Sequence, residues 1–89
     1  MSPIWKHELT ALSGSLYLPK GSKILSFMAQ RMAFVVYVLQ GDNDGEREEF
    51  RYKLILTGGS MDMTLGYRFI GTAMRDDGFV AHCFVKDNA

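Results

Sequence analysis

Short apolar segments alternate with polar, turn-forming segments along the whole chain. The segment at 33–39 (AFVVYVL) has no charge, no Gly and no Pro, and β-branched and aromatic residues dominate it. This composition predicts a central strand that is covered on both faces. A helix is the competing interpretation, but the polar run at 40–45 ends the segment too soon for a helix of ordinary length.

Several other segments have strand patterns, with apolar residues at alternate positions in the clearest cases. In the segment at 49–57, alternation places Phe50, Tyr52, Leu54 and Leu56 inward and leaves Arg51, Lys53 and Ile55 outward. The predicted strands are 4–9, 16–18, 23–30, 33–39, 49–57, 67–74 and 79–86. Turns or loops are predicted at 13–15, 19–22, 30–32, 41–48, 57–60 and 75–78, and residues 61–65 form either one helical turn or a loop.

Six or seven short strands joined by Gly, Asp, Asn and Ser turns predict an all-β fold, either a small antiparallel sandwich or a barrel. With 89 residues the chain is long enough for one domain, which we assign to 1–89. The order of the strands in space does not follow from the sequence.

Charge and cysteine content exclude some classes of function. Ten basic and ten acidic side chains cancel, so the chain has no global attraction to nucleic acid or to anionic lipid. One cysteine excludes an internal disulfide framework, which favours a reducing compartment. The N-terminus lacks the pattern of a signal peptide, and no apolar run is long enough to span a membrane. We therefore expect a cytoplasmic protein without a membrane partner.

The titratable residues do not form a pattern typical of a metal site or an active site. The two histidines are His7 and His82, and alternation directs Cys83 away from His82. His82 fits a hydrogen-bonded residue that is either in the core or half-buried, and Cys83 fits a small buried hydrophobe. No acid–base pair or Ser-His-Asp order stands out. We expect no enzyme, no metal and no cofactor.

An acidic segment between two predicted strands superficially resembles a calcium loop. Asp42, Asp44 and Glu46 surround Gly45, but the later ligands and the flanking helices of a calcium-binding hand are missing. A solvated loop is therefore the expected structure.

One candidate binding site follows a predicted strand. Closely spaced backbone N–H groups at Thr57, Gly58, Gly59 and Ser60 can bind an anion, and three arginines can add positive charge, namely Arg51, Arg68 and Arg75. This set predicts a modest anion pocket that holds, for example, a nucleotide. A plain turn at the end of a strand is the alternative.

The six methionines suggest a second kind of contact. Five of them are near predicted strand ends and loops, namely Met28, Met32, Met61, Met63 and Met74. Core filling is the simpler role, but Met at a surface suits protein contacts. A chain of this size also buries a limited core, so a homodimer, a higher oligomer or a partner would help to stabilise it.

The order of several segments resembles that of a known group. These segments are IWKHEL at 4–9, LPKGSKILS at 18–26, TGG at 57–59, YRFIGT at 67–72 and GFVAHCF at 78–84. They are similar to a family of small uncharacterised proteins of bacteriophages and prophages, classed as a domain of unknown function. The resemblance implies a phage accessory protein in the cytoplasm of a bacterial host, with no established catalytic residues.

Three functions remain open at this point. The first is an anti-defence protein that binds and inhibits a host immune protein complex, such as a CRISPR effector. The second is a sponge that sequesters a nucleotide immune signal. The third is a structural or assembly role in the virion.

Overall fold

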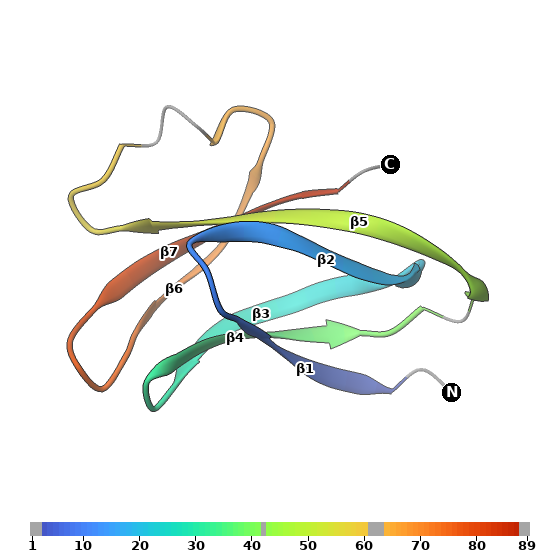
Figure 1. Ribbon diagram of the computed structural model, residues 1–89, viewed down its shortest axis with the longest axis horizontal. Helices are drawn as coiled ribbons and strands as arrows, with labels where there is room; N and C mark the ends of the chain where they lie inside the picture. Colours follow the sequence, from blue (N-terminus) through green and yellow to red (C-terminus); the bar gives the residue numbers. More distant parts are fainter. Residues whose placement is uncertain (1–2, 42, 61–63, 88–89) are drawn as a thin grey trace.

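Seven antiparallel strands in two sheets form the fold (Figure 1). The computed structural model describes residues 3–41, 43–60 and 64–87. The strands are β1 (Ile4–Leu9), β2 (Ser13–Lys20), β3 (Lys23–Gln30), β4 (Ala33–Leu39), β5 (Asn43–Leu56), β6 (Arg68–Met74) and β7 (Val80–Asp87). One sheet has the order β1-β4-β3, and the other has the order β2-β5-β7-β6. In the described part of the chain, no helix is long and apolar enough to cross a membrane.

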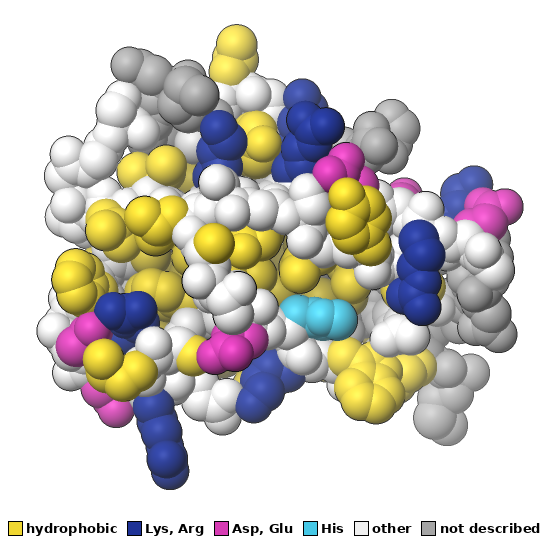
Figure 2. All heavy atoms as spheres, viewed as in Figure 1, with side chains coloured by type: hydrophobic (Ala, Val, Ile, Leu, Met, Phe, Trp, Pro, Cys, Tyr) yellow, Lys and Arg dark blue, Asp and Glu magenta, His cyan; other side chains and the backbone are white. Residues whose placement is uncertain are grey.

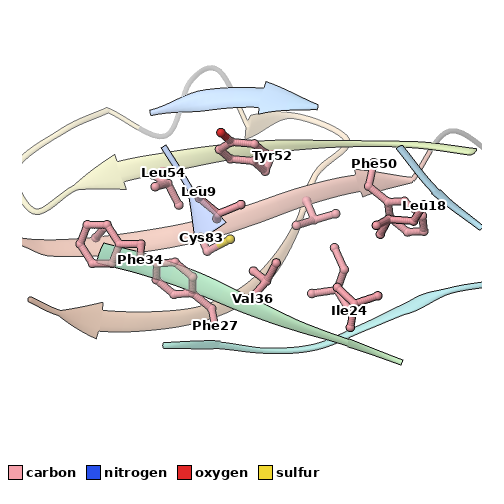
Figure 3. Close-up of a cluster of buried hydrophobic side chains, with 13 residues drawn as sticks. Leu9, Leu18, Ile24, Phe27, Phe34, Val36, Phe50, Tyr52, Leu54 and Cys83 are labelled. Carbon is pink, nitrogen blue, oxygen red and sulfur yellow. The ribbon is translucent and has the colours of Figure 1, made fainter. Parts of the chain in front are cut away.

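The two sheets pack face to face, which confirms the predicted all-β sandwich. Their inner faces form one cluster of buried side chains, part of which Figure 3 shows. The cluster consists of Leu9, Leu18, Ile24, Phe27, Phe34, Val36, Val38, Phe50, Tyr52, Leu54, Ala81, Cys83 and Val85. On one side of the sandwich the edge strands β3 and β6 come together, and a Cβ on Gly71 would lie 3.7 Å from the Cβ of Phe27.

The central strand β4 is correctly placed, but it is not covered by a layer on both faces. Phe34, Val36 and Val38 enter the core, while Tyr37 on the opposite face is half-buried. Val35 also points outward, yet only 2 % of its surface is exposed. Its cross-strand neighbours Glu8 and Met28 flank it, so side chains of the same sheet, rather than a further layer, cover it.

Strand β5 begins at Asn43, so the prediction of a polar loop at 41–48 is wrong for most of that segment. Two of the acidic residues there contact β2 and the turn after it: Glu46 lies 3.4 Å from the Lys20 ammonium, and Glu48 accepts the Gly21 N–H at 3.2 Å. Antiparallel pairing with β2 therefore overrides the low strand propensity of this polar sequence. The calcium-loop residue Asp42 lies outside the described residues.

Strand β2 is also longer than predicted, because residues 13–15 are a strand and not a turn. Their register partners on β5 are Arg51, Tyr52 and Lys53. Gly14 lies opposite Tyr52, and a Cβ at Gly14 would come within 3.0 Å of the Tyr52 hydroxyl oxygen. The aromatic ring thus covers the glycine backbone, which lets a Ser-Gly-Ser sequence continue the strand.

The turn at 19–22 is confirmed. The Ser22 N–H donates to the Pro19 carbonyl oxygen at 3.1 Å, so Pro19 occupies the first turn position. Gly21 has φ 90°, a positive value that glycine adopts without strain. The last hairpin is confirmed as well, although β6 and β7 each begin one residue later than predicted.

The β3–β4 hairpin has only Arg31 and Met32 between its strands, which lies within the turn predicted at 30–32. Arg31 has φ 58°, a left-handed conformation that is unfavourable for a residue with a Cβ. The Asp76 N–H donates to the Arg31 carbonyl oxygen at 3.0 Å, which ties this turn to the β6–β7 hairpin.

We expect Arg31→Gly to raise the free energy of unfolding by about 0.5–1 kcal/mol, because relief of left-handed strain exceeds the added freedom of the unfolded chain. Urea unfolding followed by circular dichroism measures this difference. Arg31→Ala removes the same side chain but keeps the Cβ, so it should give no gain. An equal gain in both variants would contradict the strain argument.

Candidate functional site

A pocket of about 380 Å³ lies on the outer face of the β2-β5-β7-β6 sheet. Its lining is mainly apolar and consists of Ile55, Leu56, Thr57, Gly58, Gly59, Phe69, His82 and Phe84. The volume lies at the small end of the range that ligand pockets occupy. It suits one amino-acid side chain or a small planar group.

Strand register explains why these side chains meet. Phe69 pairs with Phe84, and Thr72 and Ile55 both pair with His82 from opposite sides, so all five point out of the same face. The Phe69 and Phe84 rings are tilted by 59° with centroids 5.5 Å apart. Phe69 remains 57 % exposed and forms a rim of the pocket.

Two threonine hydroxyls hold the imidazole of His82. The Thr57 Oγ1 lies 3.1 Å from Nε2, and the Thr72 Oγ1 lies 2.8 Å from Nδ1. In either neutral tautomer, one ring nitrogen donates to a hydroxyl and the other accepts from one. Because both nitrogens are engaged, the ring has a fixed orientation in the pocket wall. The predicted half-buried, hydrogen-bonded role of His82 is confirmed.

The segment after β5 is a tight turn. The Gly59 N–H donates to the Leu56 carbonyl oxygen at 2.8 Å, and Gly58 at the third turn position has φ 94°. A positive φ there is characteristic of a type II turn, which explains the glycine. The Thr57 N–H donates to the Val80 carbonyl oxygen at 3.1 Å. Two of the N–H groups expected to bind an anion therefore already have backbone acceptors.

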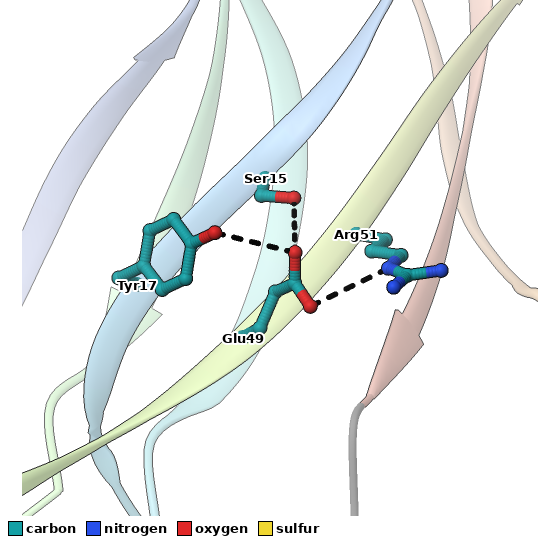
Figure 4. A network of polar contacts seen from close by, with 4 residues as sticks. All are labelled: Ser15, Tyr17, Glu49 and Arg51. Atoms are coloured by element: carbon teal, nitrogen blue, oxygen red, sulfur yellow. Dashed lines mark hydrogen bonds and ion pairs between the residues drawn. The ribbon is translucent and has the colours of Figure 1, made fainter.

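The structure does not bring the predicted arginines to this turn. Arg51 precedes Thr57 by six residues on β5, which places the two backbones about 20 Å apart. The Arg51 Nε lies 3.4 Å from Glu49 Oε1, and Glu49 also accepts hydrogen bonds from Ser15 and Tyr17, at 2.7 and 3.4 Å (Figure 4). Arg51 thus belongs to a polar network that joins β2 to β5.

The Ser15 hydroxyl, with a smaller contribution from Arg51, holds the pKa of Glu49 below its usual range. A depressed pKa in the folded state stabilises the fold above the usual carboxyl pKa, and this contribution is lost as the pH falls through the lowered value. We expect the free energy of unfolding to fall less on acidification in Glu49→Gln and in Ser15→Ala than in the wild type. Urea unfolding at pH 6 and pH 3 tests this, and a wild-type pH dependence in Glu49→Gln would contradict it.

The other two arginines lie at separate places. Arg75 makes two hydrogen bonds to Asp77, at 2.6 and 3.1 Å, and its guanidinium stacks 5.3 Å from the Phe34 ring and 5.0 Å from the Phe79 ring. It therefore closes one end of the core. Arg68 is on β6 beside a different hollow, lined with Gly66, Tyr67, Val85 and Lys86. The candidate residues Arg51, Arg68 and Arg75 do not converge on Thr57–Gly59, and Ser60 does not line the pocket.

The described residues contain no group of three or more His, Cys, Asp or Glu side chains that could hold a metal ion. Cys83 is fully buried in the core, as predicted, and burial raises the pKa of its thiol to about 12. The thiol is therefore protonated and shielded in the folded protein. Of the five methionines considered for protein contacts, Met28, Met32 and Met74 are exposed. Met61 and Met63 lie outside the described residues.

Sequence reasoning missed Phe69 and Phe84 as neighbours of His82. Alternation did place Ile55 outward, and an apolar residue at an outward position was the signal that this face carries a hydrophobic surface. Two further facts were needed, namely that β7 lies between β5 and β6 and that the register aligns Phe69 with Phe84. Neither follows from a single sequence.

Comparisons of the chain with known proteins give one match. No curated protein and no solved structure matches the chain. One family model matches residues 1–89, and its description is "Domain of unknown function (DUF7352)". Since the match spans the full 89 residues, this all-β chain belongs to that family, whose function is unknown.

Proposed function

We propose that the protein is a non-catalytic binding module and that the pocket around His82 receives an apolar side chain of a protein partner. The observation that carries this proposal is the pocket of about 380 Å³. It is walled by Phe69, Phe84 and Ile55 on the outer face of a sheet. A pocket that accepts one buried anchor is the usual centre of a protein interface.

The surroundings of the pocket support a protein partner. Phe69 and Met74 remain largely exposed, and both lie on the same face of β6 as Thr72. Exposed aromatic and Met side chains beside a hollow are enriched in protein interfaces. An anchor residue would enter the pocket, and these two side chains would pack around it.

The chemistry of the lining argues against a nucleotide in this pocket. Among the described residues that line it, none is Lys or Arg. The N–H groups of Thr57 and Gly59 already donate to backbone carbonyls. A phosphate here would have no charge partner, whereas an apolar side chain needs none. We therefore propose protein binding, rather than sequestration of a nucleotide, as the function of this pocket.

The partner we propose is a host immune protein complex, and the protein would act as an anti-defence factor of a phage. The support is the resemblance of its sequence segments to phage and prophage proteins, together with a binding pocket that lacks an acid–base pair. A small module that covers a functional surface of a larger complex can inhibit it without any catalytic step.

The test compares Phe69→Glu with Met28→Glu, which changes a side chain of similar exposure (51 % against 57 %) on the outer face of the other sheet. Each tagged chain is used to capture proteins from lysate of a defence-bearing bacterium, and quantitative mass spectrometry measures the yield. We expect a protein complex that wild type and Met28→Glu retain and that Phe69→Glu loses at least tenfold. The wild-type chain should also raise phage plaque counts on that host.

Two results would overturn the proposal. One is a captured complex whose yield is equal for Phe69→Glu and wild type. The other is a tightly bound nucleotide in the purified chain, released on denaturation, which would return the sponge function to first place. Circular dichroism of both variants confirms that a loss of capture is not a loss of folding.

A further inference from the structure

The two sides of the sandwich differ in how their strand edges are covered. On one side β3 and β6 pack against each other. On the other side β1 is the end strand of the first sheet and β2 is the end strand of the second, and neither has a further strand beside it among the described residues (Figure 1). An end strand of this kind presents unpaired N–H and C=O groups that can pair with another strand.

Strand β1 also exposes part of its inner face. Trp5 pairs with Val38, which is 1 % exposed and lies in the core, yet Trp5 itself is 55 % exposed. Figure 2, in the orientation of Figure 1, shows apolar side chains at the surface in the region where Figure 1 places β1 and β2. A hollow of about 270 Å³ lies near the other end of β1, where Leu9 and Leu12 are part of its lining. The core is therefore incompletely covered along this edge.

The sequence of β1 is complementary to itself in an antiparallel arrangement. In an antiparallel pair, two residues that lie directly opposite each other point their side chains to the same face of the sheet. The two-fold axis of a symmetric pair of β1 strands must therefore pass through a residue and not between two residues. Centred on His7, the pair places Lys6 opposite Glu8 of the second copy, twice by symmetry. Centring on Lys6 would place two ammonium groups opposite each other, and centring on Glu8 would do the same with two carboxylates.

We propose that β1 pairs with β1 of a second copy of this chain, antiparallel and centred on His7, to join two three-stranded sheets into one of six strands. In this register Trp5 of one copy lies opposite Leu9 of the other, on the inner face and beside the hollow. The partner's tryptophan thus covers the apolar edge that a single copy leaves exposed. This proposal is independent of the His82 pocket, which lies on the outer face of the other sheet.

Charge reversal on β1 tests the pairing. Sedimentation velocity of wild type over 1–500 µM should show a monomer–dimer equilibrium in the micromolar range, because the paired surface is small. Lys6→Glu and Glu8→Lys should each weaken dimerisation about tenfold or more, since each places like charges opposite each other twice. The double variant restores opposite charges, so it should recover most of the wild-type affinity.

A matched control removes a lysine from the same face of the same sheet. Lys23 on β3 pairs with Leu39, as Ile4 does, but it lies on the far side of β4 from β1. Lys23→Glu should therefore leave the dimer unchanged. A chain that stays monomeric to 500 µM would overturn the proposal. A dimer that is insensitive to both single charge reversals, or one that the double variant does not restore, would overturn it as well.

A cysteine on the symmetry axis gives a second, independent readout. In the proposed register His7 faces its own copy, so His7→Cys should form an intermolecular disulfide under mild oxidation. The native Cys83 is fully buried and should not interfere. Lys23→Cys, on the edge strand β3, should remain monomeric on a non-reducing gel. Equal crosslinking of the two variants would show that the contact is not specific to β1.

Discussion

Phe50→Ala should lower the free energy of unfolding by about 4 kcal/mol, the largest effect we expect from a core substitution. Phe50 is 2 % exposed and lies on β5, with Leu16 of β2 and Asp87 of β7 as its register partners. Its ring therefore fills the core beneath three strands at once. A domain of this size has a total stability of roughly 5–13 kcal/mol, so the variant should approach the limit of folding.

Guanidinium unfolding, followed by circular dichroism, measures the loss for Phe50→Ala. Phe69→Ala is the control, because it removes the same side chain from an exposed position on the outer face of the same sheet. Its loss should stay below about 1 kcal/mol, the value of its contact with Phe84. Similar losses for the two variants would mean that the core does not lie between the sheets as described.

Alternation predicted the inner face of β5 correctly from the sequence. Phe50, Tyr52 and Leu54 are buried in the core, and Arg51 and Ile55 point to the opposite face. The period of two residues is a local property of any strand that has one buried face, so a single sequence reveals it. The same reasoning placed Cys83 and His82 on opposite faces of their strand, as the structure shows.

The prediction failed where pairing depends on residues distant in sequence. Residues 43–48 are polar and contain a glycine, so their local sequence indicates a loop. In the structure they extend β5 because β2 runs beside them, and Lys20 and Gly21 provide partners for Glu46 and Glu48. Such a strand is stabilised by its neighbour rather than by its own composition.

At the candidate site, too, contacts between residues distant in sequence did not follow from the local sequence. The turn at Thr57–Gly59 was found from its glycines, but the expected partners, the arginines, lie elsewhere. The arginines were grouped with this turn because of their positive charge, whereas Arg51 and Arg75 each pair with a carboxylate two residues away. Strand order placed aromatic rings beside the turn instead. Three of the seven residues singled out from the sequence therefore line the pocket, but the apolar rest of its lining was not predicted.

Gly41→Ala should destabilise the protein by about 3 kcal/mol, because the new methyl group would overlap backbone atoms. A Cβ at Gly41 would overlap the Lys20 carbonyl oxygen and would lie 2.8 Å from the Ser22 nitrogen. A side chain could rotate away, but these backbone atoms are held in the β2–β3 turn. The Ser22 hydroxyl is buried, donates to the Pro19 carbonyl oxygen at 2.6 Å and accepts the Gly41 N–H at 2.9 Å.

Gly45→Ala is the matched control, since a Cβ at Gly45 meets no atom within 4 Å. We expect its effect on the free energy of unfolding to stay within about 0.5 kcal/mol. Urea unfolding of both variants gives the comparison, and two-dimensional NMR locates any change around Ser22. If Gly41→Ala and Gly45→Ala were equally stable, the segment after β4 would not lie against the β2–β3 turn. Close approach of these two segments is therefore what requires glycine at position 41.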